Sequence, residues 1–401
     1  MKFMNQKNFL QIKYWIYVIS ILIVIRTLLH TEDIFWDYNI YINAAREFIE
    51  GRNPYGVGLP VFPFTYPPIV LIFFASINEF LAPFLLFIYL LSILLFCLFF
   101  RKEPKIFIYA ILISIALLEI RRQSMTYAIL TGNIGFFLHL AIISLWLFRN
   151  NFNTKIALYT TIAIGAIIKP PIFSCYVLLP LLADAKISVS KIIPGLITII
   201  TVILIYALQI VMFPELFSNF MNSLNYQVLG GTEAGIDGWS FGSLWIHASN
   251  SYVIAIFGHI ITSVFIIAFW VYYKRRYLDK IENTDFVRLC ISIIPVVICI
   301  IIMPRLKIYD YTIMNFLLIY LLLKIKVFEI NFNFIFKSGI SLLSIIAISI
   351  WAIQLALYYF RFAYPGEILS QIIPIYFPTV LVIIIALVDR SKKIRLDTWP
   401  K

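Results

Sequence analysis

A polar segment between the first two apolar blocks of the chain carries side chains that could accept or donate protons. It starts with Asp37 in DYNIYINAAREFIEGRNPYG and ends in FPFTYPP. A carboxylate within hydrogen-bond distance of a hydroxyl can take its proton, so Asp37 is a candidate general base. The same side chain would also suit the N-cap of the helix that follows, and the two roles are compatible. Asp33, about one helical turn earlier, is the second candidate for the base.

Two further segments hold groups that could bind an anion or a polar ligand. Arg305, Lys307 and Tyr309 lie in a short polar segment, and Lys169 ends an apolar block just before two prolines. Fixed cations stabilise a departing anion, although Lys169 could instead extend its ammonium group to the membrane interface. The segment 214–250 is rich in glycine and aromatic residues, and its plausible ligand-binding residues are Glu233, Asp237, Trp239 and His247. His247 would either donate to a phosphate or assist the base, or be an interfacial histidine without a chemical role.

The composition of the chain indicates that the apolar blocks around these polar segments lie in a membrane. The 401 residues are 62% hydrophobic and only 13% charged, about half the charged fraction usual in soluble domains. Apolar blocks recur near the length that crosses a bilayer, and backbone groups in lipid must be satisfied within helices. We therefore expect an all-α, polytopic integral membrane protein that forms a single domain over 1–401. The expected spans, about twelve in number, are 10–30, 81–100, 106–123, 133–149, 155–169, 171–184, 190–213, 251–273, 286–303, 309–326, 338–360 and 372–389.

Basic residues predict which ends of these spans face the cytoplasm. They cluster in short groups between apolar blocks, which indicates topology and not nucleic-acid binding despite the net charge of +12. Placing the groups inside puts both termini in the cytoplasm and leaves the segments 31–80 and 214–250 outside. The first apolar block is long enough to span and no small-residue cleavage site follows it, so we expect it to be a retained helix. The apolar stretch 69–80 is too short to cross and is expected as a half-buried outer helix. The four cysteines form no CxxC pair and are expected to be packing residues.

The segment after Asp37 has the periodicity of an amphipathic helix. Its apolar residues recur at spacings of three and four and share one face, and Gly51 and Pro54 would end the helix. These residues are Tyr38, Tyr41, Ala45, Phe48 and Ile49. We expect the helix to lie on the membrane surface with Asp37 at its leading end.

The same segment resembles the first outer loop of glycosyltransferase family 87, within the GT-C superfamily of membrane glycosyltransferases. The matching residues are Asp37-Tyr38, Tyr41, Ala44-Ala45, Gly51, Pro54-Tyr55 and Tyr66-Pro67-Pro68. Gly132-Asn133, Lys169-Pro170-Pro171 and the stretch 304–311 are further points of similarity. The chain departs from relatives that carry Asp-x-Asp, since Phe35 precedes Trp36-Asp37, and from those with Gln where it has Asn133.

The resemblance implies a GT-C-type enzyme that transfers a hexose, by resemblance mannose, from a polyprenyl-phosphate donor with inversion. The acceptor would be a lipid-linked or glycan hydroxyl at the outer face of the plasma membrane, with Asp37 as the base and the segments 31–80 and 214–250 covering the site. Lys169, Arg305, Lys307 and Tyr309 would hold the donor phosphate. The residues expected to contact substrate are Tyr41, Asn53, Tyr55, Tyr66, Asn133, Glu233, Asp237 and Trp239. No cofactor or nucleotide sugar is expected, and metal dependence stays open.

Two other functions compete with this interpretation. A transporter or lipid flippase would place charged residues near mid-span, often in two related halves. Here Glu119, near the end of a span, is among the few ionisable residues inside spans, and no similarity between halves is visible. An O-antigen ligase or polymerase would also use large outer loops and basic residues. The early loop with Asp37 favours the transferase that uses a monophosphate donor.

Overall fold

A computed structural model shows helices throughout the residues that it describes. These are 36–56, 64–101, 104–108, 110–111, 132–149, 152–183, 189–229, 245, 251–276, 285–304, 313–314 and 316–321. Over these ranges the chain forms α-helices and short 3₁₀ helices and no β-strand. The all-α prediction is thus confirmed for the described part of the chain.

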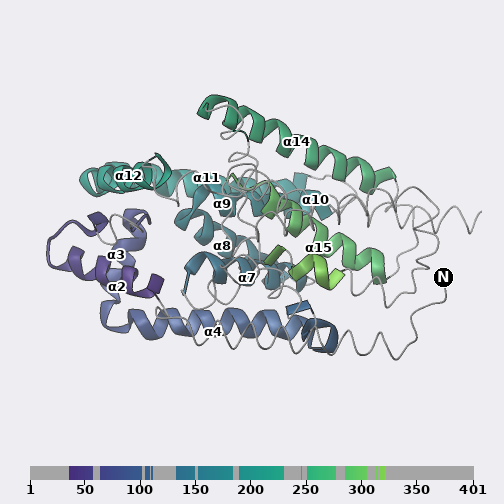
Figure 1. The fold of residues 1–401 in the computed structure, drawn as a ribbon, viewed down its shortest axis with the longest axis horizontal. Coiled ribbons are helices and arrows are strands. Elements are labelled where there is room, and N and C mark those ends of the chain that lie inside the picture. Colours follow the sequence, from purple (N-terminus) through teal and green to yellow (C-terminus); the bar gives the residue numbers. More distant parts are fainter. Residues whose placement is uncertain are drawn as a thin grey trace, which may run out of the picture. The chain divides into compact units, whose positions relative to one another are not determined.

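The helices fall into two compact units; Figure 1 labels the helices along the chain. The first contains α2 (Trp36–Ile49), η1 (Pro54–Gly56), α3 (Pro68–Ser76), η2 (Asn78–Phe80), α4 (Leu81–Phe100), α7 (Ile134–Leu147) and α12 (Pro214–Leu229). The second contains α9 (Pro170–Phe173), η3 (Ser174–Leu178), α10 (Leu179–Ala183), α14 (Tyr252–Arg276) and α15 (Asp285–Ile301). Residues of α8 (Phe152–Ile168) and α11 (Val189–Met212) are divided between the two units.

Within the part of the chain that the structure describes, three helices are long and apolar enough to cross a membrane. They are Asn78–Phe100, Val189–Met212 and Val253–Tyr272, and they agree with the expected spans 81–100, 190–213 and 251–273. These helices support the prediction of a membrane protein. The helices α7, α8 and α15 match the expected spans 133–149, 155–169 and 286–303 in position. With 14, 17 and 17 residues they are shorter than the three helices named above.

The remaining spans were predicted with less success or are not tested. Residues 170–183 form three short helices in succession, which contradicts the single helix expected over 171–184. Pro180 accounts for the break before α10, because it lacks the N–H that would bond to the carbonyl of Tyr176 in a continuous helix. Pro170 and Pro171 instead form the start of α9, where an N–H has no helical partner. The expected spans 10–30, 338–360 and 372–389 lie outside the described residues, and 106–123 and 309–326 are described only in part. The count of about twelve spans and the cytoplasmic placement of the termini stay predictions.

The amphipathic helix predicted after Asp37 is present as α2. It begins at Trp36, so Asp37 lies in its first turn, and the prediction of Asp37 as the N-cap is wrong. Tyr38, Tyr41 and Ala45 are buried as predicted, whereas Ile49 in the last turn is 56% exposed. The buried face therefore ends before the last turn.

Gly51 ends α2 in a left-handed conformation. Its φ is 73°, and the N–H groups of Gly51 and Arg52 bond to the carbonyls of Phe48 (3.1 Å) and Glu47 (2.8 Å). This pair of hydrogen bonds is the Schellman motif, which favours glycine because other residues are strained at positive φ.

Replacing Gly51 by Ala is expected to lower the free energy of unfolding by about 1–2 kcal/mol, through backbone strain alone. A Cβ atom there would have no neighbour within 4 Å, so no clash contributes. Gly56→Ala is the matched control, since a Cβ at Gly56 is equally unhindered and its φ is not in the left-handed range. Unfolding of the purified protein in detergent measures both variants. Equal losses at the two positions would contradict the strain argument.

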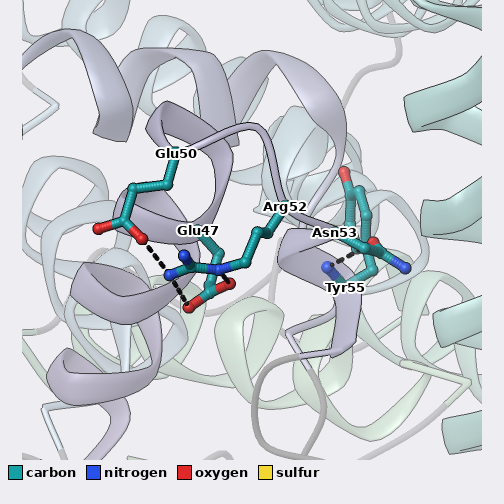
Figure 2. A network of polar contacts seen from close by, with 5 residues as sticks. All are labelled: Glu47, Glu50, Arg52, Asn53 and Tyr55. Atoms are coloured by element: carbon teal, nitrogen blue, oxygen red, sulfur yellow. Dashed lines mark hydrogen bonds and ion pairs between the residues drawn. The ribbon is translucent and has the colours of Figure 1, made fainter.

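A polar network fixes the chain between α2 and η1 (Figure 2). The guanidinium group of Arg52 pairs with the carboxylates of Glu47 and Glu50, and its Nη2 donates to Glu47 Oε1 at 2.7 Å. The hydrogen bond from Arg52 lowers the pKa of Glu47. Asn53 Oδ1 accepts a hydrogen bond from the backbone N–H of Tyr55 at 3.1 Å and so closes the turn that leads into η1. Exposed ion pairs of this kind contribute little stability, so the network serves mainly to direct the chain.

Residues 64–76 pack against α11 and α12 through buried polar contacts. The Oε1 atom of Gln209 accepts a hydrogen bond at 2.9 Å from the N–H of Ile69, in the first turn of α3. Ser223 Oγ donates to the carbonyl of Phe64 at 2.9 Å, and the Tyr55 ring contacts the rings of both Phe64 and Phe220. The segment 214–250 was expected as a loop, but its first part is the helix α12. A short helix expected over 69–80 is present as α3, but it ends at Ser76, and residues 78–80 form η2, which leads into α4. The placement of this helix on the outer side stays a prediction.

Hydrogen bonds to helix ends organise the second unit. Trp270 Nε1, on α14, donates to the carbonyl of Leu182 near the end of α10 at 2.8 Å. His259 Nε2, also on α14, contacts the carbonyl of Ile302 just after α15 at 3.0 Å. Carbonyls at helix ends have no partner within their own helix, so these side chains satisfy groups that would otherwise be buried at a cost.

Candidate functional site

The carboxylate of Asp37 is held by a side chain from a distant part of the sequence. Asn133 Nδ2 donates a hydrogen bond to Asp37 Oδ2 at 2.9 Å, across 96 residues of sequence. Asp37 is partly exposed, whereas Asn133 is 5% exposed. The fold thus brings together the residue predicted as the base and a residue predicted to bind substrate.

The orientation of the Asn133 amide follows from its second hydrogen bond. Asn133 is the N-cap of α7, and its Oδ1 accepts a hydrogen bond from the backbone N–H of Gly135 at 2.8 Å. A backbone N–H can only donate, so the amide oxygen must face Gly135 and the NH₂ group must face Asp37. The carboxylate therefore lies beside the N-terminus of α7, where the helix dipole favours negative charge.

A pair of buried tyrosines lies next to this contact. The hydroxyls of Tyr41 and Tyr66 are 2.9 Å apart, and their rings meet edge to face with centroids 5.2 Å apart. The N–H of Ile134 donates to the Tyr41 hydroxyl at 3.4 Å, so both Asp37 and Tyr41 connect α2 to the first turn of α7. Burial, followed by the nearby hydroxyl of Tyr66 and charge of Asp37, raises the pKa of Tyr41. Burial and then the charge of Asp37 raise the pKa of Tyr66.

The raised pKa values of Tyr41 and Tyr66 give these two side chains a different role from that of Asp37. Tyrosine hydroxyls with raised pKa values stay protonated at neutral pH, so Tyr41 and Tyr66 act as hydrogen-bonding groups and not as bases. Asp37 is then the side chain of the three that can accept a proton. The arrangement combines a carboxylate, an amide that orients it and two neutral hydroxyls, which suits deprotonation of a bound hydroxyl.

Gly132 and Tyr38 determine where Asn133 sits. Gly132 has a φ of 71°, and a Cβ atom there would lie 2.5 Å from Tyr38 Cε1. Tyr38 in turn donates a hydrogen bond from its hydroxyl to the carbonyl of Leu85, on α4, at 3.1 Å. The Tyr38 ring can therefore pack against the backbone of residue 132 only because that residue has no side chain.

The hydrogen bond between Tyr41 and Tyr66 predicts a measurable coupling. Tyr41→Phe and Tyr66→Phe should each lower the free energy of unfolding by about 1–3 kcal/mol, because each removes a partner from a buried hydroxyl. The double variant should lose less than the sum of the two, since no buried hydroxyl of the pair then remains. Equilibrium unfolding in detergent of the three variants and the wild type checks this. Additive losses would show that the two hydroxyls do not interact.

Three other predicted site residues are described, and their surroundings differ. Asn53 is exposed and its side-chain oxygen is engaged in the turn before η1. Tyr55 is buried among Phe64 and Phe220, and no described residue gives its hydroxyl a hydrogen bond. Lys169 is partly exposed and lies in the second unit, between α8 and α9.

The other predicted residues lie outside the described part of the chain, and their roles stay predictions. They are Asp33, Glu233, Asp237, Trp239, His247, Arg305, Lys307 and Tyr309.

Sequence reasoning missed two residues that shape the site and its surroundings. Tyr38 was assigned to the apolar face of α2 and to the Asp37-Tyr38 pair of the family resemblance, with no role at the site, although its ring and hydroxyl contact neighbours of Asp37. Gln209 was not singled out, although its buried side chain bonds α3 to α11. An uncharged amide within an apolar span requires a hydrogen-bond partner, and this was the signal that could have identified Gln209.

The chain was also compared with known proteins. No protein-family model, curated protein or solved structure matches it. The resemblance of the outer loop to glycosyltransferase family 87 therefore stays a prediction from the residues themselves.

Proposed function

We propose that the protein is a membrane glycosyltransferase that moves a hexose from a polyprenyl-phosphate donor to a hydroxyl of a lipid-linked or glycan acceptor. The observation that carries the proposal is the hydrogen bond between Asn133 and Asp37, at 2.9 Å. It orients a partly exposed carboxylate at the start of a helix that belongs to the first polar segment. The donor class, and mannose as its sugar, rest on the resemblance of that segment to glycosyltransferase family 87.

The reaction would be a single displacement at the anomeric carbon. The acceptor hydroxyl oxygen attacks that carbon while the Asp37 carboxylate takes the hydroxyl proton. The bond between the anomeric carbon and the phosphate oxygen breaks, and the polyprenyl phosphate leaves with the electron pair. The new glycosidic bond forms on the opposite face of the sugar, so the configuration inverts.

The surroundings of Asp37 fit the acceptor side of this reaction. Asp37 is a partly exposed residue, and its charge lies near the buried hydroxyls of Tyr41 and Tyr66. Lys169, Arg305, Lys307 and Tyr309 are proposed for the donor phosphate on the basis of sequence. The outer face of the plasma membrane and the segments that cover the site are proposed on the same basis.

Transfer by the purified protein in lipid vesicles tests the proposal. The donors are radiolabelled polyprenyl-phosphate mannose and polyprenyl-phosphate glucose, with a nucleotide sugar as the comparison donor and a crude lipid extract as the acceptor. We expect label to pass from one of the polyprenyl-phosphate donors to an acceptor and not from the nucleotide sugar. Transfer from the nucleotide sugar alone would contradict the donor class. Movement of the labelled lipid across the vesicle membrane without transfer would favour a flippase.

A further inference from the structure

We infer that Asn133 is a positioning residue for Asp37, whose amide holds the carboxylate in place, and not a residue that binds substrate as the sequence predicted. The inference rests on the proposed function and adds a specific role within it. It starts from the two hydrogen bonds of the Asn133 side chain, both of ordinary length and both to protein groups.

The burial of Asn133 leaves little of its side chain for a substrate. The residue is 5% exposed, its amide oxygen is bonded to the N–H of Gly135, and its amide nitrogen is bonded to Asp37. Asp37 is the more accessible partner of the two. A hydroxyl that approaches from solvent would therefore meet the carboxylate and not the amide.

The position of Asn133 is itself fixed by rigid structure. It caps α7, and α7 packs against α4, where the rings of Tyr89 and Phe137 meet edge to face with centroids 4.6 Å apart. Gly132 adds a backbone conformation that few residues tolerate. Asn133 thus holds the carboxylate of Asp37, on α2, in a fixed position relative to the packed helices α4 and α7.

The hydrogen bond from Asn133 matters because a carboxylate must be aligned with the hydroxyl to act as a base. The aspartate side chain has several staggered rotamers of similar energy. A hydrogen bond from a fixed donor selects one of them, and misplacement of a reacting group by about 1 Å can cost on the order of 100-fold in rate. The amide suits this task because it donates a hydrogen bond without adding a charge beside the base.

Asn133→Asp separates positioning from helix capping. The new carboxylate keeps an acceptor for the N–H of Gly135, and aspartate is as good an N-cap as asparagine. It removes the donor to Asp37 and places a like charge beside it. Among the residues that the structure describes, the titratable groups coupled to Asp37 are Tyr38, Tyr41 and Tyr66, and burial raises their pKa values, so they stay neutral. Two adjacent carboxylates repel each other when both are ionised, so Asp37 would lose its proton only at a higher pH than in the wild type.

The test combines transfer kinetics with unfolding of the same variants. Asn133→Asp should reduce turnover at neutral pH by about 10-fold to 100-fold and move the acidic limb of the pH profile to higher pH. Asn133→Ser, which keeps the cap but has no amide, should also reduce turnover, with a smaller shift of the acidic limb, because it removes the hydrogen bond to the carboxylate without adding a charge. Asn43→Asp is the control. Asn43 lies exposed on α2, and the substitution adds the same negative charge there. Turnover and a pH profile equal to those of the wild type in both Asn133 variants would overturn the inference.

A second readout does not depend on activity. Asn133→Asp should lower the midpoint of thermal unfolding, and adding Asp37→Asn should restore it, because the exchanged pair again has one amide donor and one carboxylate acceptor. If the second substitution does not restore the midpoint, the side chains of Asn133 and Asp37 are not in contact, and the inference is overturned. If the wild type transfers no sugar while this rescue is observed, the proposed function fails and the Asn133–Asp37 contact stands.

Discussion

Asp37→Asn is expected to reduce turnover by about 10²-fold to 10⁴-fold, the usual contribution of a general base. Asparagine has the shape of aspartate, and its side-chain oxygen can still accept the hydrogen bond that Asn133 donates to Asp37. The substitution therefore removes the proton acceptor and leaves the contact between α2 and α7. Turnover measured at saturating donor, together with the unfolding midpoint of each sample, separates loss of chemistry from loss of structure.

Two further variants make this result specific to Asp37. Glu79→Gln removes a carboxylate from an exposed position in η2 of the same unit and should leave turnover unchanged. Asp33→Asn tests whether Asp33, the second candidate for the general base, takes the proton instead. Full activity of Asp37→Asn combined with loss of activity in Asp33→Asn would assign the base to Asp33 and contradict the role proposed for Asp37.

Gly132→Ala is expected to have the largest effect on stability, about 2–5 kcal/mol. A residue other than glycine is strained at a φ of 71°, which costs about 1–2 kcal/mol. The new Cβ would also lie 2.5 Å from Tyr38 Cε1 and 2.6 Å from Cδ1, and such overpacking costs about 1–3 kcal/mol. The ring of Tyr38 or the start of α7 must shift, so turnover should fall as well.

Comparison with Gly51→Ala isolates the two contributions. Both glycines have nearly the same positive φ, but only the one at 132 has a side chain in the space that a Cβ would occupy. The difference in unfolding free energy between the two variants therefore measures the clash with Tyr38. If Gly132→Ala is no more damaging than Gly51→Ala, the Tyr38 ring does not constrain this position.

Local features of the fold were predictable because their causes are local. The spacing of Tyr38, Tyr41 and Ala45 indicated the buried face of α2, and Gly51 indicated its end. Length and apolar composition were enough to place the helices Asn78–Phe100, Val189–Met212 and Val253–Tyr272. The start of α2 was misplaced because the boundary residue of a helix depends on hydrogen bonds that the pattern does not specify.

The pairing of Asp37 with Asn133 was not predictable from the sequence. Both residues were chosen as site residues separately, but a single sequence does not show which residues 96 positions apart will meet. The contact arises because α2 packs beside the start of α7, and that packing depends on Tyr38 and Gly132. Periodicity identifies which face of a helix is buried and leaves its partner unspecified.

The configuration of the transferred sugar is the measurement that tests the central claim most directly. The wild-type protein is given a polyprenyl-phosphate hexose of known anomeric configuration, and the anomeric configuration of the product is determined by NMR or by linkage-specific glycosidases. With Asp37 as a general base in a single displacement, the product has the configuration opposite to that of the donor. Retention is incompatible with a single in-line displacement, and it would contradict the role of Asp37 proposed here.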